Sequence, residues 1–412
     1  MDTLTIPRAN AMPAPTWHRL RMNDADIHLP AKLEAARKVD VQCEESLLGD
    51  EGAFAEALAA LSETVDARTA SPGALEGEGA PAESDALDEV ALSPYQSQEL
   101  ENLCLSPADV FATGMGDEAR EYLEFVAGEP IVLATQPGER ASAAVRIEGV
   151  DGAVNAAAID VVAAPGSSCS LTIALDSPVA GTGVVGTLLR VFAGADAQVD
   201  VTATQTLDDS WIALDDAGIV LDERACVQVR HTVLGAGRSY TGLDADVRGN
   251  DARLNVDTRY LGRHQQQRDF NYVARQRGAR TACAMEASGV LAGASQKTLR
   301  GTIELVRGCK GSRGSEQETV LLADDRARNR SVPVILCGED DVAGNHGATI
   351  GHVRPEQLLY LASRGLSPDA AEQLFLRATL EEAAITAPDN ATRAAIVRLG
   401  STLAEDFEEA IA

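Results

Sequence analysis

The central part of the sequence, residues 131–352, consists of short strand-like runs separated by Gly, Asp or Asn. Apolar and polar residues alternate inside these runs, as in Ser170-Leu-Thr-Ile-Ala-Leu and Gln198-Val-Asp-Val-Thr. This alternation gives each strand one buried face. No helical pattern lies between the runs, which disfavours a sheet of the Rossmann type. A β-sandwich and a β-solenoid remain as the two candidate folds.

The residues at the buried positions favour the solenoid. Apolar residues make up 45% of the chain but aromatic residues only 4%, so the apolar mass is mostly Ala, Val and Leu. Small side chains suit thin, repetitive packing, and turns such as Gly-Asn-Asp and Gly-Ala-Gly separate the runs. The pattern therefore predicts a mainly β fold built on a parallel β-helix of stacked turns.

Residues 1–130 predict an N-terminal helical domain. Leu33–Lys38 and Ala53–Leu61 contain good helix formers with apolar spacing near 3.6 residues. An acidic stretch rich in Gly and Pro follows over residues 71–93 and predicts a mobile linker.

Residues 353–412 predict a C-terminal helical domain of three helices. Pro355 suits the first position of a helix, and Gly365 suits its left-handed end. Ser367 then caps a second helix, and a third is expected over about residues 391–410. Three packed helices after a β domain are suited to a contact with another protein.

The charge and the cysteines exclude several functions. The net charge of −28 argues against nucleic acid or an anionic membrane as a partner. The start of the sequence does not resemble a secretory signal, and no apolar run approaches the ~20 residues of a membrane span. The seven cysteines are scattered and form no Cys-x-x-Cys pair, which predicts neither a disulfide framework nor a zinc site. These features predict a cytoplasmic protein.

Several ordered motifs resemble one family. They are Ala287-Ser-Gly-Val-Leu, Leu299-Arg-Gly-Thr-Ile, Glu316 to Asp324, Asn345-His-Gly-Ala-Thr-Ile-Gly and Leu359-Tyr-Leu-Ala-Ser-Arg-Gly-Leu. Together they are similar to the SufB/SufD family of iron–sulfur cluster assembly proteins, and the His-Gly-Ala-Thr string fits its SufD branch best. The matches run from about residue 240 to residue 380, whereas the N-terminal third matches weakly.

The resemblance implies a right-handed parallel β-helix flanked by helical domains. It also implies a non-catalytic scaffold subunit of a SufBCD complex, which pairs with a SufB-like subunit through the β-helix. A SufC-like ATPase would dock on the C-terminal helices, and a cysteine desulfurase system would act through the complex. The chain itself is expected to bind no nucleotide, because Gly308-Cys-Lys-Gly-Ser lacks the spacing of a phosphate-binding loop.

His346 is the first candidate site residue, because the matching histidine of the family lies where a nascent iron–sulfur cluster shared with the partner is thought to form. Imidazole ligates iron. The alternative is a histidine that forms a hydrogen bond in a turn or fixes a subunit contact. Gly344 stands where SufD proteins commonly carry a cysteine, so the thiolate suited to a cluster is absent. Cys337 is the candidate substitute, although a cysteine after Val-Ile-Leu is more typical of a buried apolar position.

The resemblance also implies a group of residues that contact the ATPase. Its members lie on the predicted C-terminal helices: Leu358, Tyr360, Arg364, Gly365, Leu366, Leu374 and Phe375. The alternative for this group is packing within a helical hairpin.

Two other functions were weighed against the scaffold. A β-helix enzyme such as a lyase or acyltransferase needs clustered acids and bases, but Asp340 and Asp341 are adjacent, so in a strand they point to opposite faces. A standalone homodimer would use the same β-helix edge as the heterodimer. The missing cysteine at position 344 keeps this second alternative open.

Overall fold

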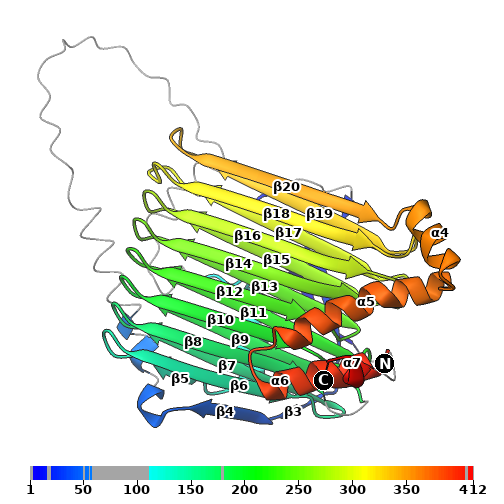
Figure 1. Ribbon diagram of the computed structural model, residues 1–412. Helices are drawn as coiled ribbons and strands as arrows, with labels where there is room; N and C mark the ends of the chain where they lie inside the picture. Colours follow the sequence, from blue (N-terminus) through cyan, green and yellow to red (C-terminus); the bar gives the residue numbers. More distant parts are fainter. Residues whose placement is uncertain are drawn as a thin grey trace, which may run out of the picture.

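The computed structural model is mainly β, with 51% of residues in strands and a β-solenoid of about eight turns. It describes residues 3–15, 20–49, 52–54, 56–57, 111–177, 181–403 and 407–411. Figure 1 shows the turns stacked from β3 and β4 at one end to β19 and β20 at the other. The prediction of a β-helix core is confirmed.

Each turn contributes one strand to each of two facing sheets. The even sheet contains β4 (Val39–Cys43), β6 (Arg140–Glu148), β8 (Ser168–Asp176), β10 (Gln198–Gln205), β12 (Cys226–Val233), β14 (Arg253–Gly262), β16 (Ala282–Leu291), β18 (Arg313–Leu322) and β20 (Ala343–His352). The odd sheet contains β3 (Glu34–Ala36), β5 (Ile131–Ala134), β7 (Ala153–Ala163), β9 (Gly183–Ala193), β11 (Trp211–Leu221), β13 (Arg238–Val247), β15 (Gln267–Gln276), β17 (Gln296–Leu305) and β19 (Arg328–Cys337).

Neighbouring strands within each sheet are parallel, apart from β4, which is antiparallel to β6. The register shows why the sequence period is hard to see. Arg253 pairs with Cys226, 27 positions earlier, whereas Arg313 pairs with Ala282, 31 positions earlier. Turns of slightly different length keep the inward-facing rows aligned because the strands, not the loops, set the register.

The core lies between the two sheets and consists of rows of small apolar side chains. In the even sheet one such row contains Val201, Val229 and Val256, each about 1% exposed or less. Rows of this kind confirm the expectation of thin, repetitive packing. Their burial supplies the main free energy that holds the turns together.

The N-terminal residues correct one prediction. The sequence predicts a helix over Leu33–Lys38, but the structure has β3 there, followed directly by β4. Pairing of β3 with β7 and of β4 with β6 outweighs the helix propensity of Leu, Glu and Ala. Helical residues occur at 52–54 and 56–57 within the predicted Ala53–Leu61 helix, and the predicted linker at 71–93 lies outside the described residues.

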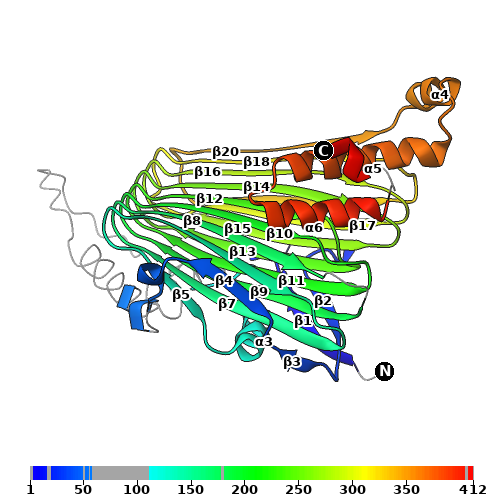
Figure 2. The same cartoon turned by 60° about the horizontal axis from the view of Figure 1, so that its bottom comes forward.

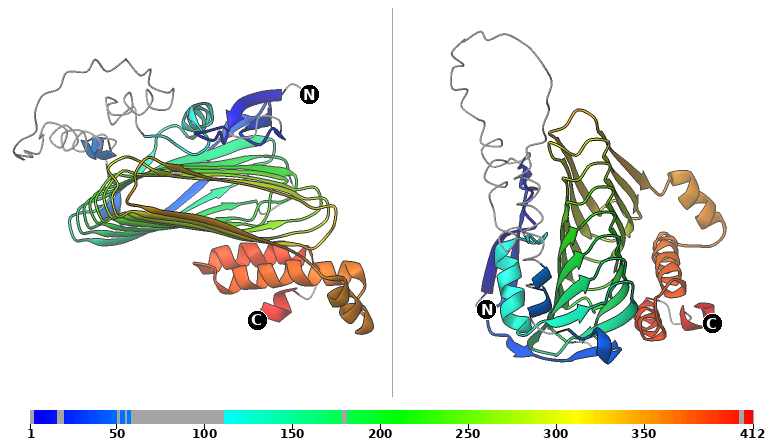
Figure 3. Two further views of the ribbon diagram at one scale, coloured as in Figure 1. Left: turned by 90° about the horizontal axis from the view of Figure 1, so that it is seen from above. Right: turned by 90° about the vertical axis from the view of Figure 1, so that its left-hand side faces the viewer.

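Further N-terminal elements cover the outer face of the odd sheet. They are the antiparallel hairpin of β1 (Thr3–Ala9) and β2 (Ala25–Pro30) and the helix α3 (Asp117–Ala127). The short helix η2 (Glu45–Leu47) follows β4 instead, and its Leu47 belongs to the interior apolar cluster. Leu123 of α3 and Ile27 of β2 are fully buried in a cluster with outward-facing residues of the odd sheet such as Leu188. Figure 3 shows these elements on one side of the solenoid and the C-terminal helices on the other.

The C-terminal helices are α4 (Pro355–Ser363), α5 (Pro368–Ile385), α6 (Asn390–Ser401) and α7 (Phe407–Ile411). Ser367 caps α5 as predicted, since its Oγ accepts a hydrogen bond from the Ala370 N–H at 3.2 Å. Gly365 ends α4 with φ of +88°. The third predicted helix is divided into α6 and α7. In Figure 2, α5 and α6 lie along the even sheet, while α4 projects beyond it.

Candidate functional site

The solenoid ends in an open turn formed by β19 and β20. Among the residues that the structure describes, each is the last strand of its sheet and has one hydrogen-bonded neighbour, β17 or β18. The solenoid is seen from above in Figure 3, and we call this end the open end. A terminal strand presents a row of free N–H and C=O groups, which is a template for a strand of another chain.

His346 lies on β20 at the open end and belongs to an inward-facing row. Its register partner on β18 is Glu316. The alternation of β18 places Glu316, Glu318 and Val320 in the buried row. His346 therefore lies in the same row as the buried Glu316, yet it is itself exposed, because no further turn of the described chain covers it.

Cys337 also lies at the open end, at the last position of β19, and it is exposed rather than a small core residue. Its Sγ donates a hydrogen bond to the Glu339 carbonyl oxygen at 3.2 Å. The Cβ of a residue at position 344 would approach Ile335 Cγ2 at 3.1 Å. Gly344 thus faces the part of β19 that adjoins Cys337, and His346 lies one inward step, about 7 Å, further along β20.

The structure therefore places His346 and Cys337 on the same open turn without joining them in a ligand set. Within the described ranges, no group of three or more His, Cys, Asp and Glu side chains is arranged to hold a metal ion. The six cysteines of those ranges are free thiols. Burial, together with the smaller effect of nearby Glu316, raises the pKa of the Cys283 thiol to about 12, so this interior cysteine is unsuited to thiolate chemistry.

A buried charged cluster lies beneath the open end, and sequence reasoning missed it. Lys297 of β17 forms an ion pair with Glu318, and the two side chains are 0% and 3% exposed. Tyr260 donates a hydrogen bond to Glu318 Oε1 at 3.2 Å, and Ser331 donates to Glu318 Oε2. The alternation Gly-x-Glu-x-Glu-x-Val in β18 was the available signal, because it assigns both glutamates to the row that contains Val320.

Glu316 differs from its neighbour Glu318. Its Oε2 atom is buried and has no hydrogen-bond partner. Burial raises the pKa of Glu316 to about 7, and Glu318 adds to the rise while Lys297 opposes it. A Cβ on Gly301 would overlap the Glu316 carboxylate, so the glycine leaves the space that this side chain occupies.

The proposed docking residues are gathered on α4, the following turn and the first part of α5. Tyr360 and Leu374 are 57% and 46% exposed, and the neighbouring Leu359 is 72% exposed. Arg364 lies over the Tyr360 ring, with its Cζ atom 5.1 Å from the ring centroid. Leu366 and Phe375 are half-buried, whereas Gly365 is exposed at the helix end. Leu358 belongs to α4.

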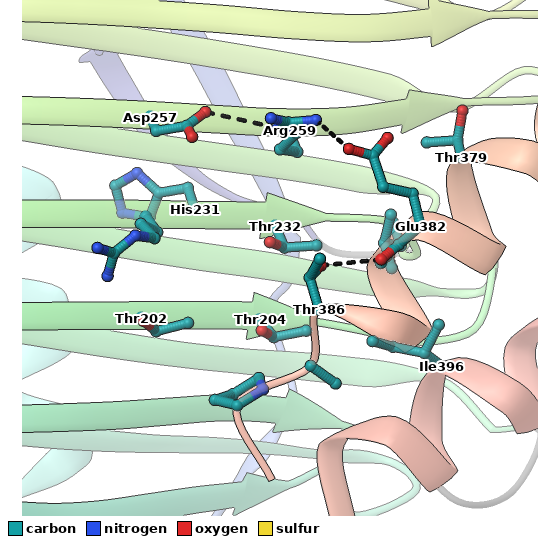
Figure 4. A pocket seen from close by; sticks show the side chains of 15 residues that line it. Thr202, Thr204, His231, Thr232, Asp257, Arg259, Thr379, Glu382, Thr386 and Ile396 are labelled. Carbon is teal, nitrogen blue, oxygen red and sulfur yellow. Dashed lines mark hydrogen bonds and ion pairs between the residues drawn. The ribbon is translucent and has the colours of Figure 1, made fainter.

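The other end of α5 is fixed to the even sheet. A pocket of about 230 Å³ lies there, and Arg259 of β14 pairs with Glu382 of α5 at 2.6 Å beside it. Figure 4 shows the two side chains facing each other. Arg398 of α6 pairs with Asp176 of β8 at 2.6 Å. Leu380 and Phe407 complete an apolar contact with Leu234 and Leu261 of the solenoid. The helices are therefore attached along α5 and α6, and α4 is left as an exposed apolar surface.

Fold and site together define a class of protein: a β-solenoid with an open final turn and a helical extension on one sheet face. Comparison with known proteins gives the family. Residues 145–379 match the family model described as "SUF system FeS cluster assembly, SufBD core domain". This match covers more than half of the chain, so the chain belongs to the SufBD family.

Individual relatives match over shorter stretches. The chain is 33% identical over 88 residues to the iron–sulfur cluster assembly protein SufD of Bacillus subtilis, and 29% identical over 84 residues to SufB of the same organism. These stretches cover 21% and 20% of this chain, and 20% and 18% of the relatives. A SufBD family protein of Mycobacterium tuberculosis is 34% identical over 108 residues, which is 26% of this chain and 13% of that protein. The matched stretches thus span a fifth or less of each relative.

In the part of the chain that the structure describes, no helix is long and apolar enough to cross a membrane.

Proposed function

We propose that this chain is a non-catalytic, cytoplasmic scaffold subunit of an iron–sulfur cluster assembly complex. The observation that carries the proposal is the open end, where both sheets of a SufBD-family solenoid stop with an unpaired edge and with His346 facing the exposed interior. A SufB-like chain would add its own strands to β19 and β20. The nascent cluster, shared with that partner, is the cargo of the complex and would form at this junction.

The interior chemistry supports a scaffold more than an enzyme. Asp340 and Asp341 lie in the turn between β19 and β20 and are exposed side chains, not a carboxylate pair in a cleft. The internal Lys297–Glu318 pair is satisfied by its own partners. A β-helix lyase or acyltransferase would need acids and bases gathered around a substrate groove.

We also propose that a SufC-like ATPase docks on α4 and the start of α5. The support is the contrast along the helical extension, because Leu359, Tyr360 and Leu374 remain exposed while Leu380 and Leu399 are buried. Exposed apolar side chains grouped on one element are typical of an interaction surface. The sequence of this chain contains no phosphate-binding loop. Nucleotide hydrolysis would therefore be carried out by the ATPase.

Co-purification tests both contacts. Tyr360→Glu with Leu374→Glu is expected to release the ATPase and to retain the SufB-like chain, because both changes lie on exposed positions far from the core. Leu366→Glu and Phe375→Glu should act in the same direction. Phe125→Glu on α3, where the side chain is 87% exposed, is the matched control and should retain both partners. Retention of the ATPase by the α4 variant would refute this docking site.

A homodimer is the second candidate. The same open edges would then pair with a second copy of this chain, as a β-edge pairs with any strand of suitable register. Light scattering of the chain alone, against the chain mixed with a SufB-like protein, separates the two assemblies.

A further inference from the structure

The pocket of about 230 Å³ beside Arg259 lies between the outer face of the even sheet and the helices α5 and α6. Figure 4 shows strand residues on one side of it and helix residues on the other. Its volume is below the roughly 300–1,000 Å³ of pockets for drug-sized ligands, so it suits a small molecule. The pocket lies on β10, β12 and β14, away from the open end and from α4, and neither proposed protein contact uses it.

The floor of the pocket consists of two rows of outward-facing side chains on β10, β12 and β14. The register aligns Thr202, Arg230 and Asp257 in one row, and Thr204, Thr232 and Arg259 in the next. Neighbouring strands are about 4.8 Å apart, so a small molecule on this floor reaches two strands at once. One ligand can therefore contact groups of both charges together with threonine hydroxyls.

Thr204 is the floor residue that most requires a partner. It is 3% exposed and lines the pocket, and its hydroxyl forms no hydrogen bond with any residue that the structure describes. A buried hydroxyl without a hydrogen bond is costly, and native proteins normally satisfy it with a protein group, a water or a ligand. The hydroxyl of the neighbouring Thr232, which is half-buried, also has no such partner in the described ranges.

The ionic groups of the pocket are only partly paired. Arg230 contacts Asp200 through one nitrogen, with Nη1 3.4 Å from Oδ1. Asp257 lies 3.6 Å from Arg259 Nε, whereas Arg259 forms its short contact, at 2.6 Å, with Glu382 of α5. Among the described residues, Arg230 thus keeps unused N–H donors and Asp257 keeps unused acceptor oxygens, on adjacent strands of one row.

The remaining walls are aliphatic. They are formed by Leu234, Ala383, Ala387 and Ile396, and no Trp, Tyr or Phe is among the described lining residues. The aromatic stacking surface on which nucleobases bind is therefore absent from this lining. The lining holds two arginines and two carboxylates, so its formal charge is zero. A neutral lining of mixed charge disfavours a multiply charged anion such as phosphate.

We propose that this pocket binds a free α-amino acid with an aliphatic side chain. The ligand's carboxylate accepts hydrogen bonds from Arg230 and the Thr204 hydroxyl, and its ammonium group donates to Asp257. Its side chain packs against Ala383 and Ile396. A zwitterion adds no net charge to the neutral lining and satisfies the unpaired hydroxyl. The inference goes beyond the scaffold function and does not depend on it.

Such a ligand contacts both the even sheet and α5, so binding strengthens the attachment of the helical extension. The Arg259–Glu382 pair that now joins them has side chains that are 48% and 58% exposed, and exposed pairs contribute little. A ligand that binds only when the helix lies on the sheet stabilises that arrangement by mass action. Leucine should therefore slow hydrogen exchange of α5 near Glu382 and leave β19 and β20 unchanged.

The test is calorimetry of the full chain, purified alone, with L-leucine as the probe. Two analogues each lack one charged group: 4-methylpentanoate has no ammonium group, and 3-methylbutylamine has no carboxylate. We expect leucine to bind with a Kd below about 1 mM. Both analogues should bind at least about tenfold more weakly, because each loses charge-assisted hydrogen bonds. Inorganic phosphate, the third probe, should not bind.

Two variants and two matched controls locate the site. Thr204→Val removes the hydroxyl with little change of shape, and Arg230→Gln removes the guanidinium group. Each should weaken leucine binding about tenfold. Thr319→Val changes an exposed threonine of the same outer row, two strands beyond Arg259, and Arg253→Gln changes an exposed arginine at the start of β14. Both controls should bind leucine like the parent chain.

Four outcomes would overturn the inference. They are leucine binding weaker than about 1 mM, equal affinity for either analogue, binding of phosphate in place of leucine, and parental affinity in both Thr204→Val and Arg230→Gln. Equal losses in the controls would place the ligand elsewhere and refute this pocket. None of these results affects the scaffold function, which the co-purification of the SufB-like chain and the ATPase tests separately.

Discussion

The middle turns of the solenoid and its open end share one backbone plan but differ in what the interior contains. In the middle, inward positions such as Ile173 and Val229 are about 1% exposed and apolar. At the open end, His346 and Ile350 occupy equivalent inward positions and are exposed, with Ile350 at 51%. Position in the row therefore does not determine burial. A following turn determines burial, and at the open end no further turn follows among the described parts of the chain.

The two regions also differ in where their charged side chains lie. Carboxylates on the outer face of the odd sheet are paired with arginines on neighbouring strands, as in Asp160–Arg190 at 2.7 Å. The charged groups beneath the open end lie inside the solenoid instead. Buried ion pairs contribute little net stability but are strongly destabilising when one partner is removed. The open end is thus stable only while its polar cluster is complete.

Removal of the buried ammonium group should have the largest effect. Lys297→Met leaves Glu318 buried without its cation, and we expect the free energy of unfolding to fall by about 3–5 kcal/mol. Urea denaturation measures it. Lys38→Met, which breaks an exposed pair with Glu148, is the matched control and should cost less than about 1 kcal/mol. The double variant Lys297→Met with Glu318→Met should recover most of the lost stability. Equal losses of stability in Lys297→Met and Lys38→Met would contradict the difference between buried and exposed ion pairs.

The apolar rows give the second test. Ile173→Ala in β8 should destabilise by about 3 kcal/mol, because a fully buried isoleucine leaves a cavity. The same substitution at Ile350 in β20 should cost well under about 1 kcal/mol in the isolated chain, since that side chain is half exposed. If a SufB-like partner covers the open end, Ile350→Ala should instead weaken the complex. Similar stability losses at both positions would mean that the open end is covered in the isolated chain.

Glu316 predicts a pH dependence. Its pKa in the folded chain is raised from 4.5 to about 7, so between these values the folded chain holds more protons than the unfolded chain. The free energy of unfolding should therefore fall as the pH rises from about 4.5 to 7, on the order of 3 kcal/mol for this group. Glu316→Gln should remove this contribution to the loss of stability with rising pH. The measurement is the urea midpoint of the parent chain and of the variant at pH 5 and at pH 8.

Asp216 of β11, away from the open end, provides a second buried carboxyl group for the same measurement of stability against pH. It is fully buried on the outer face of the odd sheet, beneath the segment that contains Met115, and burial raises its pKa to about 7 as well. It accepts a hydrogen bond from the Met115 N–H at 2.8 Å and does not face the open end. Asp216→Asn should therefore remove a further part of the fall in stability between pH 5 and pH 8, and its effect should add to that of Glu316→Gln because the two carboxyl groups share no partner. A double variant that loses no more of this pH dependence than either single variant would contradict the expectation.

The attachment of the helical extension should be the smallest effect. Arg398→Ala removes the ion pair with Asp176, whose partners are 44% and 11% exposed, and should cost about 0.2–1 kcal/mol. Hydrogen exchange of α6 should rise while exchange of β8 stays unchanged. A loss as large as that of Lys297→Met would mean that the helices belong to the core of the solenoid.

Much of the fold follows from the sequence because its signal is local. The alternation in runs such as Gln198–Thr204 determines which residues face the core, and Ser367 and Gly365 mark helix ends through their backbone preferences. The helix predicted at Leu33–Lys38 is wrong because its decisive contacts, with β6 and β7, come from more than a hundred residues away. Local propensity does not contain such contacts.

The candidate site also contains some residues that the sequence identified and others that it did not. His346 was found through the family resemblance, and its place on β20 is consistent with an interface role, which stays a prediction. Glu316, Lys297 and Glu318 were missed because charged residues in a strand are ordinarily assigned to the solvent face. The register of β17, β18 and β20 is what brings them together, and register depends on turn lengths that vary from 26 to 32 residues.

The most direct test of the open end uses a proline on its free edge. The Ala343 N–H donates to the carbonyl of Ser312, directly before β18, so odd-numbered N–H groups of β20 face β18 and even-numbered groups face the free edge. Ala348→Pro therefore removes a free-edge donor and leaves the bonds to β18 intact. The measurement is the affinity of this variant for a SufB-like chain, by calorimetry, with Tyr360→Glu as the control. We predict at least a tenfold loss for Ala348→Pro and none for the control; parental affinity in Ala348→Pro would contradict assembly through the open end.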